Sequence, residues 1–303
     1  MEVLAEYHLT YTSARIDQDK ISSSCHIQPS IIPNISLSAM SDDIDVVVYR
    51  HYYPPGVKRV IASGSSAFIG EIDESTVIKY PLAPGDTSRL EIERTLLEIV
   101  SPHHRIIGLK SFSDTGLYLE RAVNGTLAYH LLESGHLAAS TQQRLTWCRE
   151  AAEAVAHIHS LGVLHCDIQP TNLLLDKDFH LKLSDFQGKL VSEDGEVLLD
   201  GGSSEPCRFY FPRDDPFEAT VQTDLFALGC TIYFIMVGNS VFPDIIDGED
   251  GWHDKVADRF AKQQFPQDSH ACSVVTLKCW LQQYNSAEDV IREIEHIEDN
   301  FHN

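Results

Sequence analysis

Basic side chains and long apolar runs are both scarce in this sequence of 303 residues. Lysine and arginine number 23 against 45 aspartates and glutamates, so the formal net charge is -22. Because this negative excess repels phosphate backbones, we expect no nucleic-acid partner. No run reaches the roughly 18 consecutive apolar residues of a membrane helix, and the first residues lack a basic segment followed by an apolar one. We expect neither a membrane span nor a secretory leader.

The cysteines and histidines lack the spacings of a metal site or a disulfide framework. The seven cysteines form no C-x-x-C pair and no set with suitably spaced histidines, and their number is odd. The 15 histidines show no H-E-x-x-H spacing, so we interpret them as packing or surface residues. This pattern favours reduced thiols in an intracellular protein, either cytoplasmic or nuclear.

The chain divides into a polar beginning and a long region with regular apolar patterns. Residues 1–45 are rich in serine, isoleucine and aspartate without a sustained period, which predicts a disordered tail. The Ser-x-x-Glu spacing from Ser88 to Glu91 predicts a capping box and a helix running to Val100. Short apolar runs that predict strands occur at residues 46–49, 57–61, 76–78, 106–112 and 117–121.

The second half of the sequence contains the clearest helical period. Apolar side chains recur at steps of three or four over residues 141–161, and Gly162 follows as a residue that tolerates positive φ. After Asp224 the pattern is mainly helical. Between these regions, buried strands are predicted at residues 163–164, 173–175 and 181–183.

Two short motifs carry the densest chemistry. Residues 165–172 read H-C-D-I-Q-P-T-N, and residues 184–188 read S-D-F-Q-G. They resemble the catalytic loop H-R-D-x-x-x-x-N and the magnesium-binding D-F-G turn of eukaryotic protein kinases. The resemblance implies that Asp167 is the catalytic base and that Asn172 and Asp185 hold Mg²⁺. Either motif alone could be a turn that bonds its own backbone, but both together, in order, favour the kinase interpretation.

The resemblance extends upstream to the residues that would hold ATP. Residues 76–79, T-V-I-K, resemble the V-A-I-K strand, which implies that Lys79 binds phosphates and pairs with an acid on the next helix. We expect that acid to be Glu93, with Glu91 as the alternative. The segment from Gly64 stands where the glycine-rich phosphate loop belongs, with Ser66 and Ile69 at its other two glycine positions. Taken alone, the lysine and the acids could be ordinary surface charges.

Further matches concern the adenine pocket and the C-terminal region. Residues 119–122, L-E-R-A, resemble the segment between the kinase lobes, so the backbones of Glu120 and Ala122 would meet adenine and Leu174 would pack beneath the ring. Asp224 resembles the aspartate that anchors the catalytic loop. The matches cover about residues 57–297 and imply an α+β, bilobed fold, with an N-lobe over residues 46–118 and the hinge and C-lobe over residues 119–303.

Two departures from the family pattern bear on regulation and rate. Cys166 replaces an arginine that neutralises a phosphate on the activation segment, so we expect activity that needs no phosphorylation there, although Ser203 and Ser204 lie in that segment. Gln169 replaces a lysine directed at the γ-phosphate. Losing such a charge-assisted contact can lower the rate about a hundredfold or more, which predicts slow catalysis.

Two other departures concern the architecture around the site. Gln187 stands in place of the D-F-G glycine, with Gly188 directly after it. Residues 211–213, F-P-R, stand in for A-P-E, and no arginine follows Trp280 until Arg292. The buried ion pair that usually joins these two regions is therefore expected to be absent, with a looser substrate-side lobe.

These residues favour an ATP-dependent serine/threonine protein kinase that uses ATP and Mg²⁺. A pseudokinase that holds ATP or a protein partner without efficient catalysis is the main alternative, and an atypical small kinase of a KEOPS-like complex is the second. The overall texture resembles divergent kinase-like proteins of filamentous fungi. The acidic composition points to a basic protein substrate and leaves the oligomeric state open.

Overall fold

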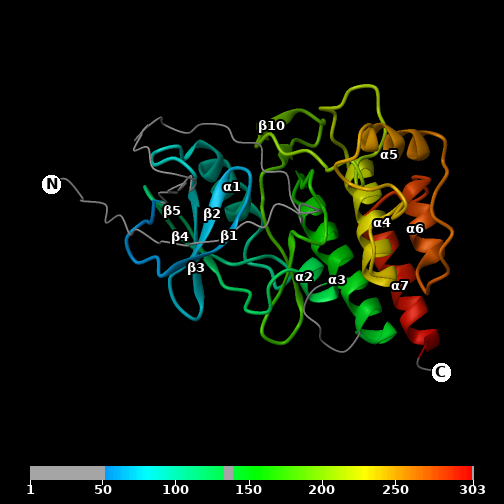
Figure 1. Cartoon of the computed structure of the whole chain (residues 1–303), viewed down its shortest axis with the longest axis horizontal. Helices are drawn as coiled ribbons and strands as arrows, with labels where there is room; N and C mark the ends of the chain where they lie inside the picture. The colour runs from blue at the N-terminus through cyan, green and yellow to red at the C-terminus, as the bar shows by residue number, and fades with distance from the viewer. Residues whose placement is uncertain (1–51, 133–138, 302–303) are drawn as a thin grey trace, which may run out of the picture. The chain divides into compact units, whose positions relative to one another are not determined.

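The computed structural model describes residues 52–132 and 139–301 (Figure 1). The chain divides into a unit of residues 1–55 and a unit of residues 56–303, and the account below concerns the second unit. The tail expected over residues 1–45 and the strand expected at residues 46–49 lie outside the described residues.

An antiparallel sheet of five strands forms the N-terminal part of this unit, in the order β1-β2-β3-β5-β4. Its central strand β3 reads T-V-I-K-Y-P and is buried along its whole length, as suits a run rich in β-branched and aromatic residues. The strand expected at residues 57–61 begins two residues later, and that expected at 106–112 begins at Leu109. The strands are β1 (Arg59–Ser63), β2 (Ala67–Glu71), β3 (Thr76–Pro81), β4 (Leu109–Ser113) and β5 (Gly116–Glu120).

Helix α1 (Ser88–Val100) packs on β3, β4 and β5 through an apolar face that includes Leu96 and Leu97. Its length matches the expectation, but the expected capping box is wrong. The N-cap residue is Thr87, one position earlier, and its hydroxyl donates to the Glu91 carboxylate at 3.0 Å. Ser88 instead donates to Asp86, because it already belongs to the first helical turn.

The C-terminal part is mainly helical, as the sequence predicts beyond Asp224. Helix α4 lies against both α3 and α6, and α3 packs against α7, so these helices lie side by side (Figure 1). Helix α3 begins at the side-chain cap Ser140, and the backbone leaves it through Gly162 at φ 73°. The helices are α2 (Leu127–Leu132), α3 (Thr141–Ser160), α4 (Val221–Val237), α5 (Trp252–Ala261), α6 (Ser273–Trp280) and α7 (Ala287–Phe301).

Among the described residues, no helix combines the length and the apolar character that a membrane span requires.

Short strand pairs carry the loops of the candidate site. The strands expected near residues 163, 173 and 181 are present with the predicted bounds. One loop joins β6 to β7, and a second turn follows β8 and leads into β9. β7 pairs with β8, while β6, β9 and β10 form a small sheet in the order β10-β9-β6. These strands are β6 (Val163–Leu164), β7 (Leu173–Leu175), β8 (Leu181–Leu183), β9 (Lys189–Val191) and β10 (Val197–Asp200).

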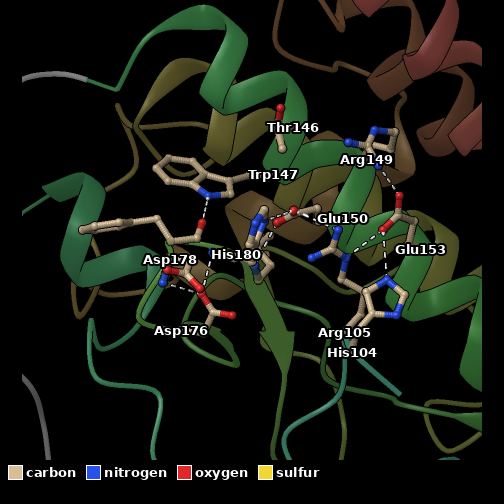
Figure 2. A network of polar contacts seen from close by, with 12 residues as sticks. His104, Arg105, Thr146, Trp147, Arg149, Glu150, Glu153, Asp176, Asp178 and His180 are labelled. Carbon is tan, nitrogen blue, oxygen red and sulfur yellow. Dashed lines mark hydrogen bonds and ion pairs between the residues drawn. The ribbon is translucent and has the colours of Figure 1, made fainter. Parts of the chain in front are cut away.

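A buried polar network joins the loop before β4 to helix α3 (Figure 2). The Arg105 guanidinium reaches the carboxylates of Glu150 at 2.9 Å and Glu153 at 2.7 Å. Glu150 is fully buried, and it also accepts from His180 at 2.6 Å and from the Leu181 backbone at 2.8 Å. Because a buried carboxylate must be paired, these contacts fix the loop of the N-lobe against the C-lobe. The α+β, bilobed arrangement expected from the sequence is confirmed.

Candidate active site

The loop between β6 and β7 is held by the first turn of α4. Asp224 is fully buried, and its carboxylate accepts the backbone N–H groups of His165 at 2.8 Å and Cys166 at 2.9 Å. Burial alone would raise the pKa of Asp224, but hydrogen bonds led by that of His159 outweigh this effect and hold the pKa below its ordinary value. The ionised carboxylate therefore holds Cys166 at its positive φ of 61°, which is uncommon for a residue with a side chain.

Asp167, the expected catalytic base, is oriented by two amide side chains from its own loop. Its two carboxylate oxygens accept from Gln169 Nε2 at 2.7 Å and from Asn172 Nδ2 at 2.8 Å. Burial raises the pKa of Asp167 to about 6, against the opposing effects of His165 and of these two hydrogen bonds. The carboxylate is thus fixed in direction and accepts protons more readily than ordinary aspartate.

Asn172 lies at the end of the same loop, and its side-chain nitrogen is fully engaged. Nδ2 donates to the Asp167 backbone carbonyl at 2.9 Å as well as to the Asp167 carboxylate. The Asn172 carbonyl accepts the Ser184 backbone N–H at 2.9 Å, which ties this loop to the turn after β8. Its side-chain oxygen, a hard donor atom, is the remaining polar group.

Lys79 forms the centre of the site, between two acids from different elements. Its Nζ is 2.5 Å from Glu93 Oε2 on α1 and 2.6 Å from Asp185 Oδ1 in the turn after β8. Burial lowers the pKa of Lys79, but the charges of the two carboxylates outweigh it and the pKa is raised. The structure thus selects Glu93 over the alternative Glu91, whose side chain contacts Thr87 at the surface.

An aromatic contact supports the turn after β8. Phe186 is fully buried, and its ring meets His165 edge to face at 5.1 Å between centroids. His165 Nε2 also lies 3.0 Å from the Ser184 carbonyl oxygen. His165 therefore supports Phe186, which agrees with the interpretation of the histidines as packing or surface residues, and the turn directs Asp185, at φ 66°, toward Lys79.

The expected phosphate loop is the tip of the β1–β2 hairpin. The Gly64 N–H donates to the Ala67 carbonyl at 2.9 Å, and Ser66 lies half-buried within this turn. Ile69 pairs directly with Lys79 across the β2–β3 ladder, so both side chains lie on the same face of the sheet. An isoleucine therefore occupies the face beside the lysine where the family pattern has a glycine.

The expected adenine contacts lie where β5 ends and the chain turns toward α2. Glu120 is the last residue of β5, Ala122 follows in the turn, and Leu174 in β7 is bridged to Thr126 just beyond it. The Glu120 side chain accepts the Gly108 N–H at 3.1 Å and pairs with a lysine of β8 at 3.1 Å. Glu120 and Ala122 thus lie where β5, the neighbour of β3, ends, and the bridge brings Leu174 to the segment that follows them.

Sequence reasoning missed an acid on the same face of the sheet as the lysine. Glu71 ends β2 and pairs with Val77 of β3, two residues before Lys79. Its carboxylate lies 2.7 Å from Arg59 and 3.3 Å from Arg121, so its charge is compensated. The signal available was its position two residues after Ile69, because alternate residues of a strand share a face.

A buried ion pair within the segment before α4 was also missed. Arg213 lies 2.8 Å from Glu205, whose side chain is fully buried. The family's usual pair joins this region to a late helix, and here both partners lie eight residues apart in the segment itself. Arg208 adds a second anchor, donating to the backbone carbonyls of Phe242 and Ile245 at 3.0 and 2.6 Å. These contacts anchor the segment by other residues than the family pattern uses, and the looser lobe expected from the sequence stays a prediction.

Comparison with known proteins agrees with this geometry. The family model described as the protein kinase domain matches residues 76–297, which is more than half of the chain. The chain belongs to the protein kinase domain family. Within this kinase domain, the match includes the β3 lysine, α1, both loops of the site and the helices up to α7.

Several curated relatives of this kinase domain carry kinase names. It is 34% identical to 3-phosphoinositide-dependent protein kinase 1 of Arabidopsis thaliana, over 55% of this chain and 36% of the relative. It is 30% identical to serine/threonine-protein kinase PDK1 of Cryptococcus neoformans, over 56% of this chain and 14% of the relative. It is 29% identical to serine/threonine-protein kinase SIK2 of Gallus gallus, over 54% and 21%. The match thus spans well under half of each relative.

Proposed function

We propose that this kinase domain transfers the γ-phosphate of ATP to serine or threonine hydroxyls of a protein. The observation that carries the proposal is the position of Lys79 between Glu93 and Asp185, beside a loop in which Asp167 is oriented by two amides. Phosphoryl transfer needs positioned charges and an acceptor for the hydroxyl proton more than covalent chemistry. Two relatives are named serine/threonine-protein kinases, which supports serine or threonine as the acceptor.

In this proposal, Mg²⁺ is held by Asn172 and Asp185. Both offer oxygen atoms, which Mg²⁺ prefers, and both lie in loops that are hydrogen-bonded to each other. Among the described residues, no group of three or more histidine, cysteine or acidic side chains could enclose a metal ion. Mg²⁺ usually keeps several water ligands and binds substrate phosphates besides one or two protein side chains, so two side chains are enough for this proposal. Bound Mg²⁺ would neutralise charge on the phosphates.

ATP would lie against β3, with Lys79 at its α- and β-phosphates. Gly64 and Ser66 in the β1–β2 turn would offer backbone amides to phosphate. The backbones of Glu120 and Ala122 would meet the adenine edge, and Leu174 would pack beneath the ring. Ile69, on the face of Lys79, narrows the space above the phosphates, which predicts weaker ATP binding than a glycine there would allow.

Asp167 would accept the proton of the incoming hydroxyl. Its pKa of about 6 leaves it mostly ionised at neutral pH while making it a better acceptor than ordinary aspartate. Gln169 donates to this carboxylate, so it orients the base and supplies no cation for the transferred phosphoryl group. We therefore propose turnover that is slow, by about a hundredfold against a lysine at that position.

A pseudokinase remains the second candidate, because Ile69 and Gln169 both weaken features that turnover uses. The KEOPS-like alternative is less suited to this chain, since helices α4, α5, α6 and α7 complete a large helical lobe. For an active enzyme, the net charge of -22 favours a basic protein substrate inside the cell.

The test is transfer of label from ATP with Mg²⁺ to myelin basic protein and histone. Asp167→Asn removes the base, and the matched control Asp178→Asn changes an exposed aspartate outside the site. Transfer by wild type and the control, but not by Asp167→Asn, would support the proposal. If ATP raises the melting temperature but neither wild type nor either variant transfers label, the pseudokinase hypothesis replaces the proposed kinase activity.

A further inference from the structure

Gln187, which stands in place of the D-F-G glycine, is buried at 8% exposure and makes polar contacts in two directions. Its side-chain Nε2 donates to Glu93 Oε2 at 3.4 Å. Its backbone carbonyl accepts the Ser203 N–H at 3.0 Å. A long amide side chain buried at this position needs a partner, and the partner is the acid of the Lys79 ion pair.

In this turn, the close backbone approach that requires a glycine is made by Gly188, one residue after the position where the family pattern has glycine. A side chain at Gly188 would collide with the backbones of Leu164 and His165, so this residue must remain glycine. Gly201 approaches the Gln187 backbone closely from the other side, and a Cβ there would lie 2.9 Å from the Gln187 Cα. Since Gly188 makes the close approach, position 187 is free to carry a side chain that reaches α1.

Glu93 has few partners for a fully buried carboxylate. Oε2 receives both Lys79 and Gln187, whereas Oε1 has no hydrogen-bond partner among the described residues. A buried acid with a single cation would be under-satisfied, because hydrogen bonds must replace the lost water. Among the described residues, the Gln187 amide is the only donor besides Lys79 that contacts Glu93 Oε2.

We propose that Gln187 is a positioning residue that holds Glu93 against Lys79 and, through its backbone, ties α1 to the activation segment at Ser203. Its relevance to phosphoryl transfer rests on the proposed function, but the mechanical link does not. The link gives this kinase domain a connection between α1 and residues 201–205 that requires no phosphate, in a chain where Cys166 has replaced the phosphate-binding arginine.

Hydrogen–deuterium exchange of the ligand-free full chain tests the link directly. Gln187→Met keeps the size of the side chain and removes the donor, and Gln142→Met, on α3, is the matched control. Loss of one hydrogen bond of this kind predicts an increase of about three- to tenfold in the exchange rates of peptides covering both α1 and residues 201–205. The control should exchange like wild type, and so would Gln187→Met if the proposal were wrong.

A double-mutant cycle separates positioning through Glu93 from a purely structural effect. Glu93→Met removes the side-chain oxygens that accept from Gln187, so Gln187→Met should add little to the exchange of α1 in that background. Independent, multiplicative effects of the two substitutions would overturn the proposal. If Gln187→Met does not fold, Gln187→Gly, which restores the family residue, takes its place in the same cycle.

Kinetics distinguish this proposal from the proposed function. If wild type transfers label, Gln187→Met should lower kcat about three- to tenfold with a smaller change in the KM for ATP, because Lys79 itself remains. If wild type transfers none, the proposed function fails, and the exchange cycle still decides whether Gln187 links α1 to the activation segment.

Discussion

Replacing Asp167 by asparagine should stabilise the folded protein at neutral pH while abolishing transfer. The pKa of Asp167 is raised to about 6 in the folded chain against an ordinary value of 3.8. A group whose folded pKa is raised favours the folded state when protonated, and this contribution is lost as pH rises from about 4 through about 6. Above pH 6 the ionised Asp167 therefore destabilises the fold.

The magnitude follows from the same two values. The interval between 3.8 and about 6 corresponds to roughly 3 kcal/mol, at about 1.4 kcal/mol per pH unit. Asp167 is half-buried rather than enclosed, so solvent screening reduces this figure, and we expect Asp167→Asn to gain about 1–2 kcal/mol at pH 7. Gln169 can turn its amide to suit the new side chain, which limits the loss of hydrogen bonds.

The assay is urea unfolding of wild type and Asp167→Asn at pH 7.0 and at about pH 4, with Asp178→Asn as the exposed control. The advantage of Asp167→Asn should be present at pH 7 and vanish near pH 4, where wild-type Asp167 is largely protonated. A difference that is absent at pH 7, or equal at both values, would refute the assignment of a raised pKa to this carboxylate.

Three other substitutions test the supports of the site. Glu150→Gln should lower the free energy of unfolding by about 2–3 kcal/mol in urea titrations, because the buried carboxylate loses its charge, whereas exposed Glu98→Gln should change it by less than about 0.5 kcal/mol. Arg213→Met leaves buried Glu205 without its cation and should cost about 3–5 kcal/mol, and a loss below about 1 kcal/mol would contradict the importance of this pair. Lys189→Met should lower turnover, because it removes the ion pair between β9 and Asp200 at the end of β10. Phosphatase treatment of wild type should leave turnover unchanged. A phosphatase-sensitive wild type would show that the segment depends on phosphate after all.

The sequence locates the residues of the candidate site where they lie close together along the chain. Asp167, Asn172 and Asp185 lie in two short loops whose spacing is fixed by the strands on either side, so a motif of a few residues locates them. Lys79 and Glu93 are 14 residues apart, and a strand followed by a helix limits the choice of partner to one or two acids. The helix period of α3 is equally local, which explains why its bounds are predicted closely.

Contacts between distant segments left no comparable pattern. Gln187 and Glu93 are 94 residues apart, and nothing in either segment indicates that an amide will meet an acid there. Arg208 reaches carbonyls more than 30 residues away, and backbone acceptors carry no sequence signal at all. The cap at Thr87 was missed for a different reason, since two adjacent hydroxyl residues offer alternative starts to the same helix.

The departures at Cys166 and Gln187 both concern how the activation segment is held without a bound phosphate. Cys166 removes a cation that binds phosphate, and its buried thiol is held neutral because burial raises its pKa. Lys189, in the activation segment, pairs with Asp200 at 3.1 Å. A carboxylate of the chain itself therefore neutralises this lysine. Gln187 adds a neutral link from that segment to Glu93. Because these contacts are formed by side chains of the chain itself, the order of the segment should depend on folding and not on phosphorylation of the segment.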